Sequence, residues 1–137
     1  MKRVFLDANI LFTAAHNPGG KAALVIELGV QGYWQLFTSA YAIEEARRNL
    51  QRKFPRSSAA LEEIRPALRI SSHHGGMPRL SGLAIKDQPI FQAALACKAT
   101  HLLTGDIRDF GRFMDRSADT HGIQIQTVAS FMIDRIS

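Results

Sequence analysis

Short apolar runs alternate with helical patterns along this chain. Residues 4–6, Val-Phe-Leu, form a run without a polar residue, which is typical of a strand buried on both faces of a parallel sheet. Alternation of strands with helices predicts an α/β fold of three layers, in which helices cover both faces of a parallel sheet of about four to five strands. The other expected strands are residues 34–38, 69–71, 101–104 and 123–127.

Helical patterns occupy the segments between these strands. Ser39 is a good N-cap for a helix over residues 40–53, and Pro89 is tolerated in the first turn of a helix over residues 88–99. Residues 71–83 are rich in Ser, Gly and Pro and predict a loop. The remaining expected helices cover residues 11–15, 21–32, 57–68, 107–116 and 128–136.

The composition excludes several classes of protein. A single cysteine, Cys97, excludes an intramolecular disulfide framework and any multi-cysteine zinc site. No stretch approaches the roughly 20 apolar residues that span a bilayer, and Asp7 follows the first apolar run too early for a secretory signal. We therefore expect one cytoplasmic domain, residues 1–137, with no membrane partner. The histidines show no metal-ligand spacing: they are His16, His73, His74, His101 and His121.

The charge balance favours an anionic partner. The chain has 17 Lys and Arg residues against 12 Asp and Glu residues, a net charge of +5. A basic chain of this kind favours nucleic acid as the first candidate.

Four aspartates fall where a parallel sheet binds ligands. Asp7 ends the first strand, Asp106 and Asp109 follow the strand at 101–104, and Asp87 opens the helix that leads into that strand. Taken one at a time, Asp7, Asp87 and Asp106 are each better explained as a helix cap. Several carboxylates at one sheet edge would repel one another without a cation, however, and hard oxygen ligands suit Mg²⁺ or Mn²⁺. Acidic metal ligands on a basic protein point to phosphodiester hydrolysis.

Three segments, in order, resemble the PIN-domain family of metal-dependent ribonucleases. They are the opening VFLDANIL, the stretch TSAYAIEEARRNL and the stretch KDQPIFQAALACKATHLLTGDIRDF. The resemblance covers essentially the whole chain and implies a PIN-like α/β/α fold. The Lys-Asp-x-Pro pattern at residues 86–89 resembles the branch of toxins from toxin–antitoxin pairs.

The resemblance implies roles for individual residues. The family's acidic quartet maps onto catalytic residues Asp7, Glu45, Asp87 and Asp106, and the metal ligands would be Asp7, Asp87, Asp106 and Asp109. Supporting residues would be Asn9, which orients the first Asp or its loop, Ser39, which caps near the metal, and Thr104, which hydrogen-bonds within the site. Family spacing favours Glu45 over Glu44, because helical periodicity does not decide between them; Glu44 can pair with Arg47 or Arg48 instead.

The family's activity implies hydrolysis of RNA by Mg²⁺ or Mn²⁺, leaving a 5′-phosphate and a 3′-hydroxyl. Toxins of the VapC type are silenced by an antitoxin partner and are often dimers, so an antitoxin and a homodimer are the partners expected besides RNA. The alternatives are a different metal-dependent phosphohydrolase, a PIN-type nuclease in RNA processing or on structured DNA, and a metal-free PIN-like binding module. Asn9 argues against an aspartyl phosphatase, which would normally have a second Asp there.

Basic residues beside the acids are candidates for contacts with RNA. Arg108, Arg112 and Arg116 recur every four residues and would form one stripe on a helix over residues 107–116. A solvated face paired with nearby aspartates explains this stripe equally well. Lys86, next to Asp87, is expected to steer a phosphate. Aromatic stacking has little support, because Trp34, Tyr41 and most Phe residues fall in core-like positions.

Overall fold

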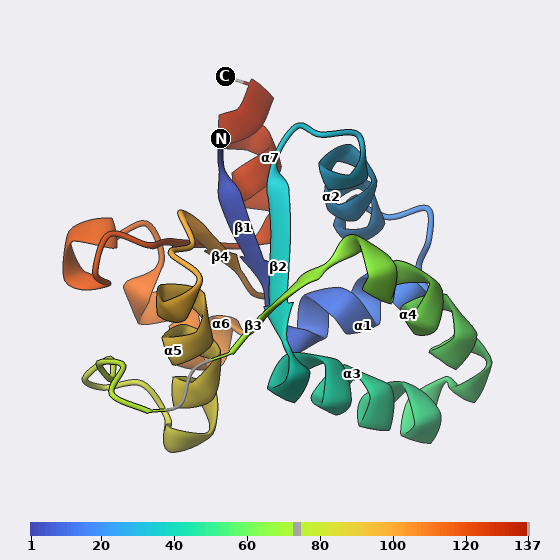
Figure 1. The fold of residues 1–137 in the computed structure, drawn as a ribbon, viewed down its shortest axis with the longest axis horizontal. Helices are drawn as coiled ribbons and strands as arrows, with labels where there is room; N and C mark the ends of the chain where they lie inside the picture. The colour runs from blue at the N-terminus through green and yellow to red at the C-terminus, as the bar shows by residue number, and fades with distance from the viewer. Residues whose placement is uncertain (73–74, 137) are drawn as a thin grey trace.

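A five-stranded, all-parallel sheet forms the centre of the computed structural model, which describes residues 1–72 and 75–136 (Figure 1). The strand order is β3-β2-β1-β4-β5. This arrangement confirms the predicted α/β class and the parallel sheet of four to five strands. The strands are β1 Arg3–Leu6, β2 Gln35–Ser39, β3 Arg69–Ser71, β4 His101–Leu103 and β5 Gln124–Gln126.

Helices flank the sheet on both sides. In Figure 1, α5 and α6 lie on one side, and α1, α2 and α4 lie on the other. The right-handed crossovers of parallel strands require this, because the chain first moves from β1 toward β3 and then returns past β1 to β4 and β5. The helices are α1 Ala8–His16, α2 Lys21–Val30, α3 Ala40–Lys53, α4 Ser58–Ile64, α5 Gln88–Ala96, α6 Ile107–Phe110 and α7 Val128–Ile136.

The core explains the uninterrupted apolar sequence of β1. Val4, Phe5 and Leu6 are fully buried, since β1 is the central strand and both of its faces are covered. Trp34 is buried next to β2, where its indole N–H donates to the carbonyl oxygen of Val25 (3.0 Å). Within the described residues, no helix is long and apolar enough to cross a bilayer.

Five predicted helices have different bounds. Those over residues 21–32, 57–68 and 88–99 end earlier, at Val30, Ile64 and Ala96. The helix predicted over residues 11–15 begins at Ala8, because the Asp7 carboxylate accepts the Ala8 N–H and caps it. The prediction of one helix over residues 107–116 is wrong: α6 has four residues, followed by a 3₁₀ turn at Gly111–Phe113. Met114 is extended there and bridges to Ile125 of β5, so pairing with the sheet ends the helix. His73 and His74 lie outside the described residues.

Candidate metal centre

The acidic residues meet at the carboxyl edge of the sheet. Leu6 of β1 pairs with Leu103 of β4, so Asp7 and Thr104 leave neighbouring strands side by side. The Asp7 N–H donates to the Leu103 carbonyl oxygen (3.1 Å), which continues the ladder by one residue. The strand register therefore brings together residues 97 positions apart in the chain.

Three carboxylates form a tight group at this edge. In the part of the chain described, Asp87, Asp106 and Asp109 are the group of His, Cys, Asp or Glu side chains that could hold a metal, with ligand oxygens all within 4.8 Å of one another. Asp87 ends the 3₁₀ turn Ile85–Asp87 before α5. The Asp106 carboxylate caps α6 by accepting the Asp109 N–H (3.1 Å), so the capping role and the clustering occur together.

The ammonium group of Lys86 lies among these carboxylates. Its Nζ is 2.9 Å from an Asp87 oxygen, 2.8 Å from an Asp109 oxygen and 3.7 Å from an Asp106 oxygen. The hydrogen bond from Lys86 lowers the pKa of Asp109, whereas burial raises the pKa of Asp87. The lysine was expected to steer a phosphate; in this structure it is the cation that compensates three like charges.

Asp7 is the most buried acid of the site, with 4 % of its surface exposed. Burial raises its pKa from 3.8 to about 6, opposed by hydrogen bonds from Thr104 (2.8 Å) and from the Ala8 N–H (2.7 Å). The charges of Glu45 and Asp87 raise it further. Asp7 therefore interacts electrostatically with Glu45 and Asp87, although it is not one of the three clustered carboxylates.

Asn9 and Thr104 join the junction of β1 and α1 to the loop that carries Asp106. The amide nitrogen of Asn9 donates to an Asp7 oxygen and to the Thr104 hydroxyl (both 3.2 Å), and its oxygen accepts the Gly105 N–H (2.6 Å). The Thr104 hydroxyl also accepts the Asp106 N–H (3.1 Å). These bonds fix Asp7 and Asp106 relative to each other. The catalytic and supporting roles assigned to these residues stay predictions.

The two glutamates of α3 have different surroundings. Glu44 pairs with Arg47, which also pairs with Glu62 at 3.1 Å. Glu45 is half-buried, and its charge raises the pKa of Asp7 and of Tyr41. Ser39 caps this helix through a hydrogen bond from the Ala42 N–H to its hydroxyl (3.1 Å).

Two neighbours of the site were not found from the sequence. Tyr41, expected in the core, is 42 % exposed, and its hydroxyl donates to the Lys86 carbonyl oxygen (2.8 Å). Its position one helical turn before Glu45 could have indicated this. Gln88, next to Asp87, is buried and bonds to Leu80 (2.9 and 2.8 Å) and to the Leu83 carbonyl (3.1 Å), which holds the preceding loop.

The predicted arginine stripe is wrong, because no single helix carries it. Arg108 lies on α6, Arg112 lies on the following 3₁₀ turn and Arg116 comes after the extended Met114. All three side chains belong to exposed residues.

The donor set fits a hard divalent cation. All three clustered ligands are carboxylates, and a positive group already lies among them. Fold and site together define an α/β protein with a cluster of carboxylates, able to hold a cation, at the carboxyl edge of its parallel sheet. The family model for the PIN domain matches residues 3–108, and the chain belongs to this family.

Three solved structures of VapBC proteins have the same fold. VapBC2 from Rickettsia felis, bound to a DNA fragment from its promoter, has a TM-score of 0.64 and 16 % identity over 91 % of this chain and 98 % of that chain. VapBC-1 from nontypeable Haemophilus influenzae (0.58) and DNA-bound VapBC from Salmonella typhimurium (0.63) are each 17 % identical over 93 % of this chain and 99 % of theirs. No curated protein sequence matches the chain.

Proposed function

We propose that this chain is an endoribonuclease that uses Mg²⁺ or Mn²⁺ at the acidic cluster. The observation that carries the proposal is the convergence of Asp87, Asp106 and Asp109 around the Lys86 ammonium group, with Asp7 close enough for the Asp87 charge to raise its pKa. A cluster that attracts an ammonium group so closely is suited to an ion of higher charge. The family membership of the chain supports a nuclease.

Different residues of the chain would hold the ion, complete the site and fix its geometry. Asp87, Asp106 and Asp109 would hold the ion, and Asp7 and Glu45 would complete the site. When bound, such an ion acts as a Lewis acid on the phosphate and lowers the pKa of a water molecule. Asn9 and Thr104 hold Asp7 and Asp106 in place through the hydrogen bonds described above.

Lys86 has a second task in this proposal. Its side chain is 64 % exposed, so a divalent ion can replace its ammonium group without exposing a buried surface. The ammonium group would then be free to bind a phosphate oxygen of the RNA, as the sequence led us to expect.

Cleavage of single-stranded RNA tests this function. We expect the wild type to cut a labelled RNA in Mg²⁺ or Mn²⁺, and Asp106→Asn to lose activity by at least about 100-fold, since one metal ligand is removed. Glu27→Gln, which removes an exposed carboxylate on α2, away from the acidic cluster, is the matched control and should retain activity. Equal activity of wild type and Asp106→Asn would refute the proposal.

We also propose that the chain is the toxin of a toxin–antitoxin pair, active in the cytoplasm and bound by an antitoxin, with a homodimer as its own assembly. The support is the likeness in fold to VapBC proteins over almost the whole chain. Expression of the wild type should arrest growth and Asp106→Asn should not. Normal growth with active, soluble wild-type enzyme would favour the alternative of RNA processing.

A further inference from the structure

An open hollow of about 530 Å³ lies between two segments that both continue into the acidic cluster. One wall is the loop with Arg79, Leu80 and Ser81, which continues to Lys86 and Asp87. The other wall runs from Arg112 to His121 and begins three residues after Asp109. Three residues of chain span at most about 11 Å, so the hollow adjoins the cluster. We call this surface the arginine hollow.

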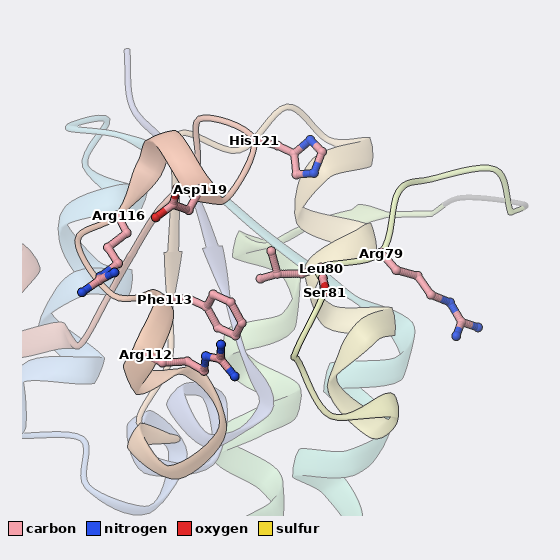
Figure 2. A pocket seen from close by; sticks show the side chains of 8 residues that line it. All are labelled: Arg79, Leu80, Ser81, Arg112, Phe113, Arg116, Asp119 and His121. Atoms are coloured by element: carbon pink, nitrogen blue, oxygen red, sulfur yellow. The ribbon is translucent and has the colours of Figure 1, made fainter.

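The middle of the arginine hollow is apolar and its rim is cationic. Figure 2 shows the side chains of Leu80 and Phe113 in the middle, with Arg112 beside the ring of Phe113. The Arg112 guanidinium carbon is 5.2 Å from the centre of that ring. Arg79 and Arg116 project on opposite sides of the hollow in the same view.

In the described part of the chain, no carboxylate pairs with the rim arginines. Within residues 1–72 and 75–136, no guanidinium group of Arg79, Arg112 or Arg116 makes an ion pair or a hydrogen bond. Arg47 and Lys86, by contrast, pair with carboxylates. Among the described residues that line the hollow, Asp119 is the one that is acidic, so three positive charges face one negative charge there.

The loop wall is held in place rather than free. Its backbone at Leu80 and Leu83 is bound by the buried side chain of Gln88, and its carbonyl at Met77 accepts a hydrogen bond from Gln92 (2.9 Å). Both glutamines belong to α5, which also follows directly on Asp87. The shape of the hollow is therefore coupled to the helix that positions the cluster, as a substrate subsite requires.

We propose that the arginine hollow binds a nucleotide of single-stranded RNA next to the phosphate held at the acidic cluster. The proposal rests on the nuclease function proposed above and names the part of the protein that holds the strand. A nucleobase would cover the apolar middle and stack on the guanidinium group of Arg112. The phosphates on either side would be bound by Arg79 and Arg116.

An RNA strand fits this surface better than an acidic protein segment does. Leu80 and Phe113, which are 5 % and 7 % exposed, offer a small apolar contact for a base between the two charged sides. The volume of the hollow lies within the range of pockets for small ligands. A strand that lies in the hollow also passes the acidic cluster, which is where a phosphodiester must be to be cut. Arg79 and Arg116 would therefore contribute to substrate binding together with Arg112.

Binding of a fluorescent 12-nucleotide RNA in EDTA tests the proposal, because it needs no cleavage. In the double variant Arg79→Gln/Arg116→Gln, we expect the Kd to rise about tenfold near 0.1 M salt, and the slope of log Kd against log salt to fall by about 1.4, since each lost phosphate contact contributes about 0.7. In Mg²⁺, KM for this RNA should rise with kcat unchanged.

The control is Arg65→Gln/Lys98→Gln, which removes the same charge from exposed residues that precede β3 and β4, at the opposite edge of the sheet. It should bind RNA nearly as the wild type does. Equal losses in both double variants would show only a general effect of charge and would overturn the proposal.

The outcomes separate the subsite from the nuclease function. Arginine-dependent RNA binding by a protein that cuts no RNA would refute the nuclease and keep the hollow as an RNA site. Cleavage with unchanged binding in Arg79→Gln/Arg116→Gln would refute the subsite and keep the nuclease, leaving an acidic protein segment as the occupant. A wild type that binds no RNA would overturn the proposal.

Discussion

Replacing Asp7 by Asn should stabilise the metal-free protein at neutral and alkaline pH. Burial raises the pKa of Asp7 from 3.8 to about 6 in the folded state. Because the folded pKa is the higher one, Asp7 favours the folded state most below pH 3.8. This contribution is lost as the pH rises from about 4 through 6, and it is constant above that range.

The size of the effect follows from the two pKa values. Their difference corresponds to about 3 kcal/mol of folding free energy at pH 8, an upper value for the cost of an ionised Asp7. Asn removes this cost, but its amide nitrogen would meet the amide nitrogen of Asn9, which now donates to Asp7. Allowing about 1 kcal/mol for that mismatch, we expect Asp7→Asn to be about 2 kcal/mol more stable at pH 8.

Urea unfolding in EDTA between pH 4 and pH 8 measures this difference. Trp34 is the single tryptophan and is 1 % exposed, so its fluorescence reports the loss of the core. The gain from Asp7→Asn should grow between pH 4 and 6 and then level off, while Asp119→Asn, at an exposed position, should show no such trend. A difference between Asp7→Asn and wild type that stays constant with pH would refute the reasoning.

Three further substitutions test other contacts of the site. Thr104→Val keeps the volume of a fully buried side chain but removes the hydroxyl that hydrogen-bonds to Asp7, Asn9 and the Asp106 N–H. We expect the free energy of unfolding in urea to fall by about 3 kcal/mol, and a fall of less than about 1 kcal/mol would contradict this network. Lys86→Gln removes the cation that competes with a metal ion for the three carboxylates. In calorimetry, Mn²⁺ should therefore bind about tenfold more tightly (about 1.4 kcal/mol), and weaker binding would show that the lysine does not compete. Glu45→Gln should reduce RNA cleavage by at least about tenfold, because the charge of Glu45 acts on Asp7. Glu44→Gln should leave cleavage unchanged, because Glu44 pairs with Arg47 instead. The reverse result would assign the catalytic role to Glu44.

The parts of the fold set by short-range patterns could be predicted from the sequence. The uninterrupted apolar run of β1 indicated a central strand, and Ser39 marked the start of α3 at the position where its hydroxyl accepts the Ala42 N–H. The order of the acids after β1 and β4 also indicated one sheet edge, because parallel strands end together.

The parts that depend on tertiary contacts could not be predicted. The periodicity of Arg108, Arg112 and Arg116 suggested a helix, but the pairing of Met114 with Ile125 breaks it after Phe110. The direction of the Lys86 side chain depends on three carboxylates from two elements, which no local pattern contains.

Tyr41 is a further case, since an aromatic residue in an amphipathic helix suggested the core. The backbone carbonyl of Lys86, 45 residues away, holds its hydroxyl at the site instead.

The chemistry of the RNA ends after cleavage tests the central claim most directly. If carboxylate-held Mg²⁺ or Mn²⁺ directs water onto the phosphodiester, the products carry a 5′-phosphate and a 3′-hydroxyl, and EDTA abolishes their formation. Mass spectrometry of a short RNA cut by the purified wild type, with Asp106→Asn prepared in parallel, distinguishes the ends. We predict 5′-phosphate products with the wild type in Mn²⁺ and none with the variant. Products with 2′,3′-cyclic phosphate ends, or cleavage that continues in EDTA, would contradict the metal-dependent mechanism.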